Sequence, residues 1–177
     1  PAQVLVFKGL TELLHAELKV SKERKNMFIL SGDAQPLDVV EMYRLAGEIL
    51  ETIKKEGVTD VITLAAYVGE SKELVMGAAT DAESMASLKE NGIPPLCRGA
   101  IGGMNGLLAG LAPMHDMHGF CILGTSTGAE PVDLLAAANL LSAIKCLLGL
   151  SMDLPLPEPM TEKIEVAPPD EVDMNYR

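Results

Sequence analysis

Residues 61–66 (VITLAA) form a run without the alternation of apolar and polar positions that marks a half-exposed strand. Such a run is typical of a strand covered on both faces, as in a parallel sheet between layers of helices. The 177-residue chain is 48% hydrophobic but only 3% aromatic, and it has no Trp. An all-β sandwich favours aromatic and β-branched residues, so this composition indicates helices packed on a sheet. We therefore predict an α/β fold.

The order of the expected elements refines this prediction. The clearest element is an amphipathic helix over residues 37–56, with Val39, Tyr43, Ala46 and Leu50 on one face. We expect strands at residues 3–7, 17–20, 27–30, 58–67, 74–79 and 119–123, further helices at 81–89 and 131–148, and a glycine-rich helix that breaks near Pro113. The second and third strands predict an antiparallel hairpin added to a mostly parallel sheet.

These elements predict a single α/β domain over residues 1–152. From residue 153 onward, prolines alternate with acidic residues, which is typical of an extended tail, residues 153–177. The chain opens on Pro1 rather than on methionine, so we expect either a processed start or a part of a longer protein.

The charge of the chain excludes several classes of partner. With 25 acidic and 14 basic residues, the net charge is −11, which repels phosphate backbones and anionic lipid; we expect neither nucleic-acid nor membrane binding. Three cysteines without Cys-x-x-Cys spacing predict buried thiols in a reducing compartment. His115, Asp116 and His118 lack a fourth metal ligand nearby, so we predict no metal site. No membrane span or signal peptide is visible in the sequence, and we expect a cytoplasmic location.

Two helices carry surfaces suited to close contact. Gly102, Gly106 and Gly110 fall four apart, so a helix places three residues without side chains on one face, where another backbone approaches closely. The last helix is apolar nearly all round and is interrupted by only three polar residues. A helix of this kind is buried in a layer or in an interface between copies of the chain.

Residues 124–128 (GTSTG) are a literal G-x-S-x-G between a strand and a helix. In α/β-hydrolases this motif presents a nucleophilic serine on a tight turn, and the acid and the histidine follow it in the chain. All three histidines of this chain precede Ser126, which opposes that interpretation. Ser126 is a candidate nucleophile only for a triad with a different chain order.

The same loop has two other interpretations. Open α/β sheets bind ligands outside the carboxyl ends of their strands, where the hydroxyls of Thr125 and Thr127 are placed to hold a phosphate or a ribose. Alternatively, the hydroxyls satisfy backbone groups of a turn. The segment from Arg98 lacks the lysine of a phosphate-binding loop, although Arg98 itself suits an anion. The candidate ligand crevice comprises Arg98, Gly99, Gly102, Gly103, Asn105, Gly124, Thr125, Ser126 and Thr127.

Several motifs follow one another along the chain: residues 30–36 (LSGDAQP), 57–58 with 61–64, 92–94 (GIP), 99–106 (GAIGGMNG), 123–124 with Asp133, Ala136 and Ala137, and 149–150. Taken in this order, they resemble the PAC2 family of proteasome assembly chaperones and their archaeal and bacterial relatives. The resemblance extends to about Leu154. It implies a three-layer α/β/α sandwich like that of purine nucleoside phosphorylases, without their catalytic residues, and we expect no cofactor.

The resemblance also implies homo-oligomers and a partner. Eukaryotic members act as heterodimers that scaffold rings of proteasome α-subunits, and archaeal relatives have been linked to proteasome binding. We therefore expect a factor, more readily a binding protein than an enzyme, that engages proteasome α-subunits or the 20S particle. The alternative is a protein or an enzyme that binds a nucleoside or phosphate at the carboxyl ends of the strands.

The resemblance reaches the C-terminus, where archaeal relatives end in a hydrophobic residue, a tyrosine and any residue. That motif inserts between neighbouring α-subunits, and the terminal carboxylate meets a lysine. Here Tyr176 is penultimate, but Asn175 stands where a hydrophobic residue belongs. The residues expected to bind the partner are Met174, Tyr176 and Arg177; the alternative is a tail whose last aromatic residue has no role.

Overall fold

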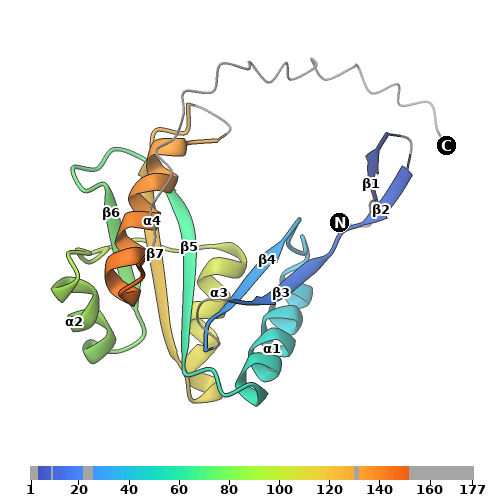
Figure 1. Ribbon diagram of the computed structural model, residues 1–177, viewed down its shortest axis with the longest axis horizontal. Coiled ribbons are helices and arrows are strands. Elements are labelled where there is room, and N and C mark those ends of the chain that lie inside the picture. Colours follow the sequence, from blue (N-terminus) through green and yellow to red (C-terminus); the bar gives the residue numbers. More distant parts are fainter. Residues whose placement is uncertain (1–3, 9, 22–25, 130–131, 152–177) are drawn as a thin grey trace.

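The computed structural model describes residues 4–8, 10–21, 26–129 and 132–151 of the chain. A mixed three-stranded sheet lies at its centre, in the order β5-β7-β6 (Figure 1). β5 (Asp60–Val68) and β7 (His118–Ser126) run parallel along their whole length. β6 (Val75–Ala79) runs antiparallel to β7 on its other side. The apolar run at residues 61–66 belongs to β5.

Helices cover both faces of this sheet and make the three layers of the predicted fold (Figure 1). On one face, α1 and α3 pack with β5 around Leu50, Val61 and Leu108. On the other face, α2 and α4 pack against β7 around Leu88 and Phe120. The bounds are α1 (Val39–Lys55), α2 (Ala82–Glu90), α3 (Gly103–Leu111), the short 3-10 helix η1 (Ala112–His115) and α4 (Leu134–Leu148).

Two glycines of β7 allow the helices to approach its backbone closely. A Cβ atom at Gly119 would collide with the carbonyl oxygen of Ala109 in α3. A Cβ atom at Gly124 would lie 2.9 Å from the carbonyl oxygen of Ala136 in α4. Positions an odd number of residues apart point to opposite faces of a strand, so β7 receives one helix layer on each side.

Two antiparallel hairpins precede the sheet in the chain, and within the described residues neither pairs with it. One joins β1 (Val4–Phe7) to β2 (Leu10–Leu13), and the other joins β3 (Ala16–Val20) to β4 (Phe28–Gly32). The second hairpin is antiparallel, as the sequence predicts, but it forms a two-stranded sheet of its own and is not added to the central sheet. β2 was not predicted, because Lys8, which has a φ of 49°, turns the chain without the Asn-Gly or Asp-Gly pair that indicates a tight hairpin.

α1 carries one apolar stripe whose two halves differ in exposure. In the second half, Ala46, Leu50 and Ile53 are buried. Val39 and Tyr43 continue the same stripe toward the start of the helix, at the i, i+4 spacing that aligns helical side chains. Both are more than half exposed. The described residues therefore leave the first half of the stripe uncovered.

Aspartates cap the starts of α2 and α4. Asp81 accepts a hydrogen bond from the amide of Ser84, as its place before a helix predicts. Asp133 does the same for the amide of Ala136, so α4 begins at Leu134 rather than at 131. Pro131, expected in the first turn of that helix, lies outside the described residues, and so does the tail at 153–177.

We expect Gly119→Ala to lower the free energy of unfolding by about 1–3 kcal/mol, the usual cost of forcing extra atoms into a packed interior. The added methyl group has to push α3 away from β7. Chemical denaturation followed by circular dichroism measures the change. Gly47→Ala in α1 is the control, because no atom lies within 4 Å of the added Cβ and alanine favours a helix by about 0.5–1 kcal/mol. A Gly119→Ala protein as stable as the parent chain would contradict the close approach.

Candidate functional site

The end of β7 and the loop after it contain the hydroxyl residues that the sequence singles out. Thr125 Oγ1 donates a hydrogen bond to the carbonyl oxygen of Glu73 at 2.6 Å. Thr127 Oγ1 accepts one from the amide of Ala129 at 3.3 Å. The Thr127 hydroxyl thus satisfies a backbone group of its own turn, whereas the Thr125 hydroxyl joins the end of β7 to the segment before β6.

Ser126 is buried, and its hydroxyl is also engaged within the loop. It accepts a hydrogen bond from the amide of Gly128 at 3.1 Å. It also bonds the carboxylate of Asp133, whose pKa is lowered first by the amide of Ala136 and then by this bond. No described hydrogen bond joins Ser126 to a histidine. His118 lies at the opposite end of the nine-residue strand, roughly 26 Å away at about 3.3 Å per residue.

Arg98 and Gly99 lie in a different part of the structure. They line a hollow of about 340 Å³ between α3, the end of β6 and the start of β7, where Gly119 also lines it. Gly124 instead pairs with Val75, at the far end of β6. The structure therefore does not bring the two groups of predicted crevice residues into one pocket.

The three cysteines differ in burial. Cys121 lies on β7 and is buried, as the sequence predicts, and this burial raises the pKa of its thiol. Cys97 and Cys146 are exposed, contrary to that expectation. Their thiols are accessible because Cys97 lies in the loop before α3 and Cys146 lies on α4 away from the side chains that pack on the sheet.

The start of α3 holds Gly102, Gly103 and Asn105 of the predicted crevice. Gly102 is the N-cap and supplies no capping side chain. Gln35, from the loop after β4, replaces it: its Oε1 accepts a hydrogen bond from the amide of Met104 at 2.8 Å. A Cβ atom at Gly103 would lie 2.7 Å from that oxygen. The sequence analysis does not predict this contact. A helix that starts at Gly-Gly has no capping side chain of its own, which indicates that another residue supplies the acceptor.

The glycine stripe of α3 is not a single contact surface within the described chain. A Cβ atom at Gly106 would collide with the carbonyl oxygen of Ile101. Gly102 and Gly110 have no atom within 4 Å of such a Cβ. Close packing of the chain on itself accounts for one of the three glycines, and a helix-packing role for the other two stays a prediction.

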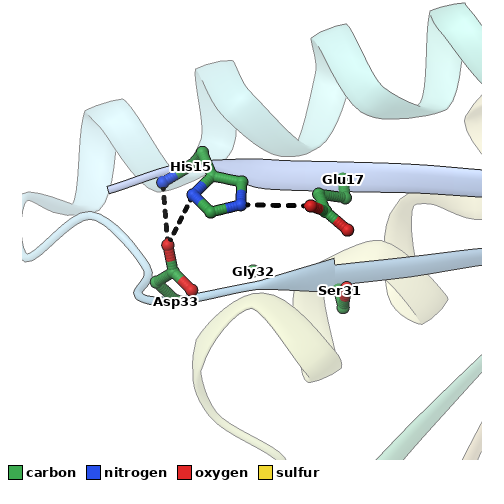
Figure 2. Close-up of a pocket in the computed structure, with 5 residues that line it drawn as sticks. All are labelled: His15, Glu17, Ser31, Gly32 and Asp33. Atoms are coloured by element: carbon green, nitrogen blue, oxygen red, sulfur yellow. Dashed lines mark hydrogen bonds and ion pairs between the residues drawn. The ribbon is translucent and has the colours of Figure 1, made fainter. Parts of the chain in front are cut away.

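His15, between β2 and β3, lies between two carboxylates (Figure 2). Its Nδ1 is 2.9 Å from Asp33 Oδ2, and its Nε2 is 3.2 Å from Glu17 Oε1. The backbone amide of His15 also donates to Asp33 Oδ2, at 3.0 Å. These side chains, with Ser31 and Gly32, line a hollow of about 230 Å³. The cluster joins the start of β3 to the end of β4.

The geometry of this cluster favours the charged imidazole. A neutral imidazole has one N–H donor, whereas both ring nitrogens of His15 face carboxylate oxygens. The hydrogen bond with Glu17, followed by the charge of Asp33, raises the pKa of His15. The hydrogen bond with Lys19, followed by that with His15, lowers the pKa of Glu17.

A second pair of an acid and a histidine joins α2 to the start of β7. The carboxylate of Asp81 accepts hydrogen bonds from the amide and the hydroxyl of Ser84 and lies 3.0 Å from Nδ1 of His118. The Ser84 amide, followed by the bond to His118, holds the pKa of Asp81 well below its usual range. The bond to Asp81 raises the pKa of His118. Since these groups stabilise the start of a helix, we interpret the pair as structural.

Among the described residues, no three His, Cys, Asp or Glu side chains gather where they would hold a metal ion. In the same part of the chain, every helix is too short or too polar to cross a membrane. The residues expected to bind the partner, Met174, Tyr176 and Arg177, lie outside the described residues.

The chain belongs to the PAC2 family, which it matches over residues 1–167. It is 36% identical over 135 residues to MJ1210, an uncharacterized protein of Methanocaldococcus jannaschii. That match covers 72% of this chain and 52% of MJ1210, so the chain spans about half the length of this relative.

Solved structures share the fold. Pyrococcus furiosus PbaB, an archaeal proteasome activator, matches with a TM-score of 0.74 and 30% identity, over 86% of this chain and 69% of PbaB. PbaA of the same organism, an archaeal homolog of proteasome-assembly chaperone, matches with a TM-score of 0.71 and 27% identity, over 86% of this chain and 63% of PbaA. These similarities confirm the predicted α/β fold class, and the family and its structural neighbours are proteins of the proteasome-assembly-chaperone type.

We expect Glu17→Gln to lower the pKa of His15 more than Asp33→Asn does, because the bond with Glu17 is the larger cause of the shift. In the parent chain, the raised pKa means that, while Glu17 is ionised, the charged His15 stabilises the fold fully below about pH 6.5 and loses that effect as pH rises through the raised value. NMR titration of the imidazole carbons measures both pKa values. His118 is the internal control, since its partner is Asp81. An unchanged pKa of His15 in both variants would contradict the cluster.

Proposed function

We propose that this protein is a non-enzymatic, homo-oligomeric factor that binds proteasome α-subunits in the manner of an assembly chaperone. The observation that carries the proposal is its membership of the PAC2 family, together with the similarity to PbaB and PbaA over 86% of the chain. PbaB is an archaeal proteasome activator, and PbaA is an archaeal homolog of proteasome-assembly chaperone.

Exposed apolar side chains support a role in binding other proteins. α4 exposes Leu135 and Leu141 on the side turned away from the sheet, as expected for a helix that is apolar nearly all round. Leu37 and Val40 are exposed at the start of α1. Clustered apolar surface of this kind marks sites of protein–protein contact. The chain has a net charge of −11, so two copies repel each other electrostatically. The uncharged apolar side chains are the places where this repulsion is weakest.

The tail, residues 153–177, is the segment proposed to bind the proteasome. Residues 153–177 combine prolines with acidic residues and end with Tyr176 before Arg177. By the resemblance to the archaeal relatives, Tyr176 is the side chain expected to dock between α-subunits, although Asn175 replaces the hydrophobic residue of their motif. In this proposal the body forms the oligomer and the tails engage the proteasome, so that several tails bind one ring with increased avidity.

A second candidate function is binding of a small anionic ligand. It is favoured by the hollow of about 340 Å³ lined by Arg98, since ligand pockets typically fall between about 300 and 1,000 Å³. A ligand that binds the folded state raises the melting temperature. A screen of nucleosides, nucleotides and sugar phosphates tests this candidate, with Arg98→Ala as the control, and a screen without any shift would contradict it.

We expect Tyr176→Ala, and removal of residues 153–177, to weaken binding to the 20S particle at least tenfold, since each tail loses its anchoring side chain. Asn175→Leu should strengthen binding because it restores a hydrophobic residue before the tyrosine. Biolayer interferometry on immobilised 20S particles and on isolated α-subunits measures the affinities. Met114→Ala, an exposed apolar position on the body, is the control.

The outcomes separate the two parts of this proposal. Unchanged affinity after removal of the tail would take the tail out of the mechanism and leave the body as the binding surface. A parent chain that binds neither α-subunits nor 20S particles would overturn the proposed function.

A further inference from the structure

The hollow beside α3 that Arg98 lines also contains two of the three thiols of the chain. Cys97 and Cys121 both line it, and they differ in accessibility: Cys97 is exposed, whereas Cys121 is only 2% exposed. Most of the other lining positions are glycine or alanine, and a Cβ atom at Gly110 would meet no other atom within 4 Å. The walls therefore leave a space of about 340 Å³ beside a single accessible thiol.

Arg98 gives this hollow a positive charge. Among the described residues that line the hollow, it alone has a charged side chain, and none is acidic. Within the part of the chain that the structure describes, its guanidinium forms no ion pair or hydrogen bond. A guanidinium is well suited to bind a carboxylate or a phosphate. In a chain with a net charge of −11, the hollow is thus a local site that favours an anion.

The buried thiol is too far from the accessible one to close a disulfide with it. Residues 94–96 pair with Gly77 on one edge of β6, whereas Ala78 pairs with Cys121 on the other edge. Two strand spacings place the segment before Cys97 about 10 Å from β7, and a disulfide needs Cα atoms about 4.4–6.8 Å apart. Burial also raises the pKa of the Cys121 thiol, which keeps that thiol protonated and unreactive.

We propose that this hollow binds an anionic low-molecular-weight disulfide and that Cys97 forms a mixed disulfide with it. The proposal rests on the second candidate function, a small anionic ligand in this hollow, and names the class of that ligand. It does not depend on proteasome binding. Because Cys121 stays reduced, the expected product is one adduct per chain, which persists instead of being displaced by an internal disulfide.

The exchange needs no reactant beyond the disulfide itself. Arg98 holds an anionic group of the disulfide at the rim, which brings a sulfur atom close to Cys97. The Cys97 thiol gives its proton to solvent, and the thiolate attacks that sulfur. A new S–S bond forms on Cys97 while the S–S bond of the reagent breaks, and the other half leaves as a thiolate that takes up a proton. Cys97 is oxidised, and the leaving half is reduced.

Little in the structure restrains the attacking thiol. Cys97 Sγ donates only a long hydrogen bond, 3.7 Å, to the carbonyl oxygen of Pro95. Cys146 on α4 is also exposed and lies outside the hollow. It is a matched control, because Lys145 precedes it in the chain as Arg98 follows Cys97. A difference between the two cysteines therefore reports on the hollow and not on a neighbouring cation alone.

Three disulfides that differ in charge test the proposal: glutathione disulfide is anionic, 2-hydroxyethyl disulfide is neutral and cystamine is cationic. The full chain reacts with each, and mass spectrometry with peptide mapping gives the rate at each cysteine. The ratio of the rate at Cys97 to that at Cys146 removes the intrinsic reactivity of each reagent. We expect this ratio to be highest for glutathione disulfide and lowest for cystamine, by about threefold or more, the effect of one exposed ion pair.

Variants assign the effect to single residues. Arg98→Gln should remove the preference for glutathione disulfide at Cys97, and high salt should weaken the preference in the parent chain because it screens the exposed charge. Cys97→Ser should abolish the persistent adduct in the hollow, whereas Cys146→Ser should keep it. Both substituted side chains at 97 and 98 are exposed, and circular dichroism checks that each variant folds.

The outcomes that overturn the proposal are distinct. A ratio that is the same for all three disulfides overturns it, and so does an Arg98→Gln protein that keeps the preference of the parent chain. A disulfide between Cys97 and Cys121 also overturns it. If glutathione disulfide leaves Cys97 unmodified while a nucleotide or sugar phosphate raises the melting temperature, the exchange is overturned and the second candidate function stands. Binding to the 20S particle is measured separately.

Discussion

Close contact between β7 and the two helix layers is the constraint on which the rest of the structure depends. Gly119 lets α3 reach the backbone of β7 on one face, and Gly124 lets α4 do so on the other. Dispersion attraction falls steeply with distance, so a side chain at either position separates a whole layer from the sheet. Leu13 of β2 and Val40 of α1 lie outside these contacts and are exposed.

The sequence predicted what is encoded locally. The run at residues 61–66 indicates a covered strand, and Asp81 before an apolar segment indicates a helix start, because each depends on neighbouring residues alone. The direction of β6 is different: covered strands have the same composition whichever way they run, and the expected mostly parallel sheet is mixed. β2 was not predicted, because the turn at Lys8 lacks the residue pairs that indicate a tight hairpin.

The candidate site was harder to predict than the fold, because its residues meet across long stretches of chain. Arg98 and Thr125 were grouped by chemical type, yet β6 places them at opposite ends of its length. The hydroxyl of Ser126 is occupied by its own turn. Gln35 is the converse case: no local pattern reveals that its partner is Met104. The most reliable prediction from the sequence was the family, because it depends on the order of several motifs and not on any single residue.

The bond between Gln35 and Met104 has a consequence for how the chain is made. It joins residues 69 positions apart, and contacts of such separation form late because the intervening loop has to close first. At about 5–20 residues per second, a ribosome needs roughly 4–14 s to extend the chain from one partner to the other. During that interval α3 has not yet been synthesised, so the segment that follows the β3–β4 hairpin has no helix start to cap.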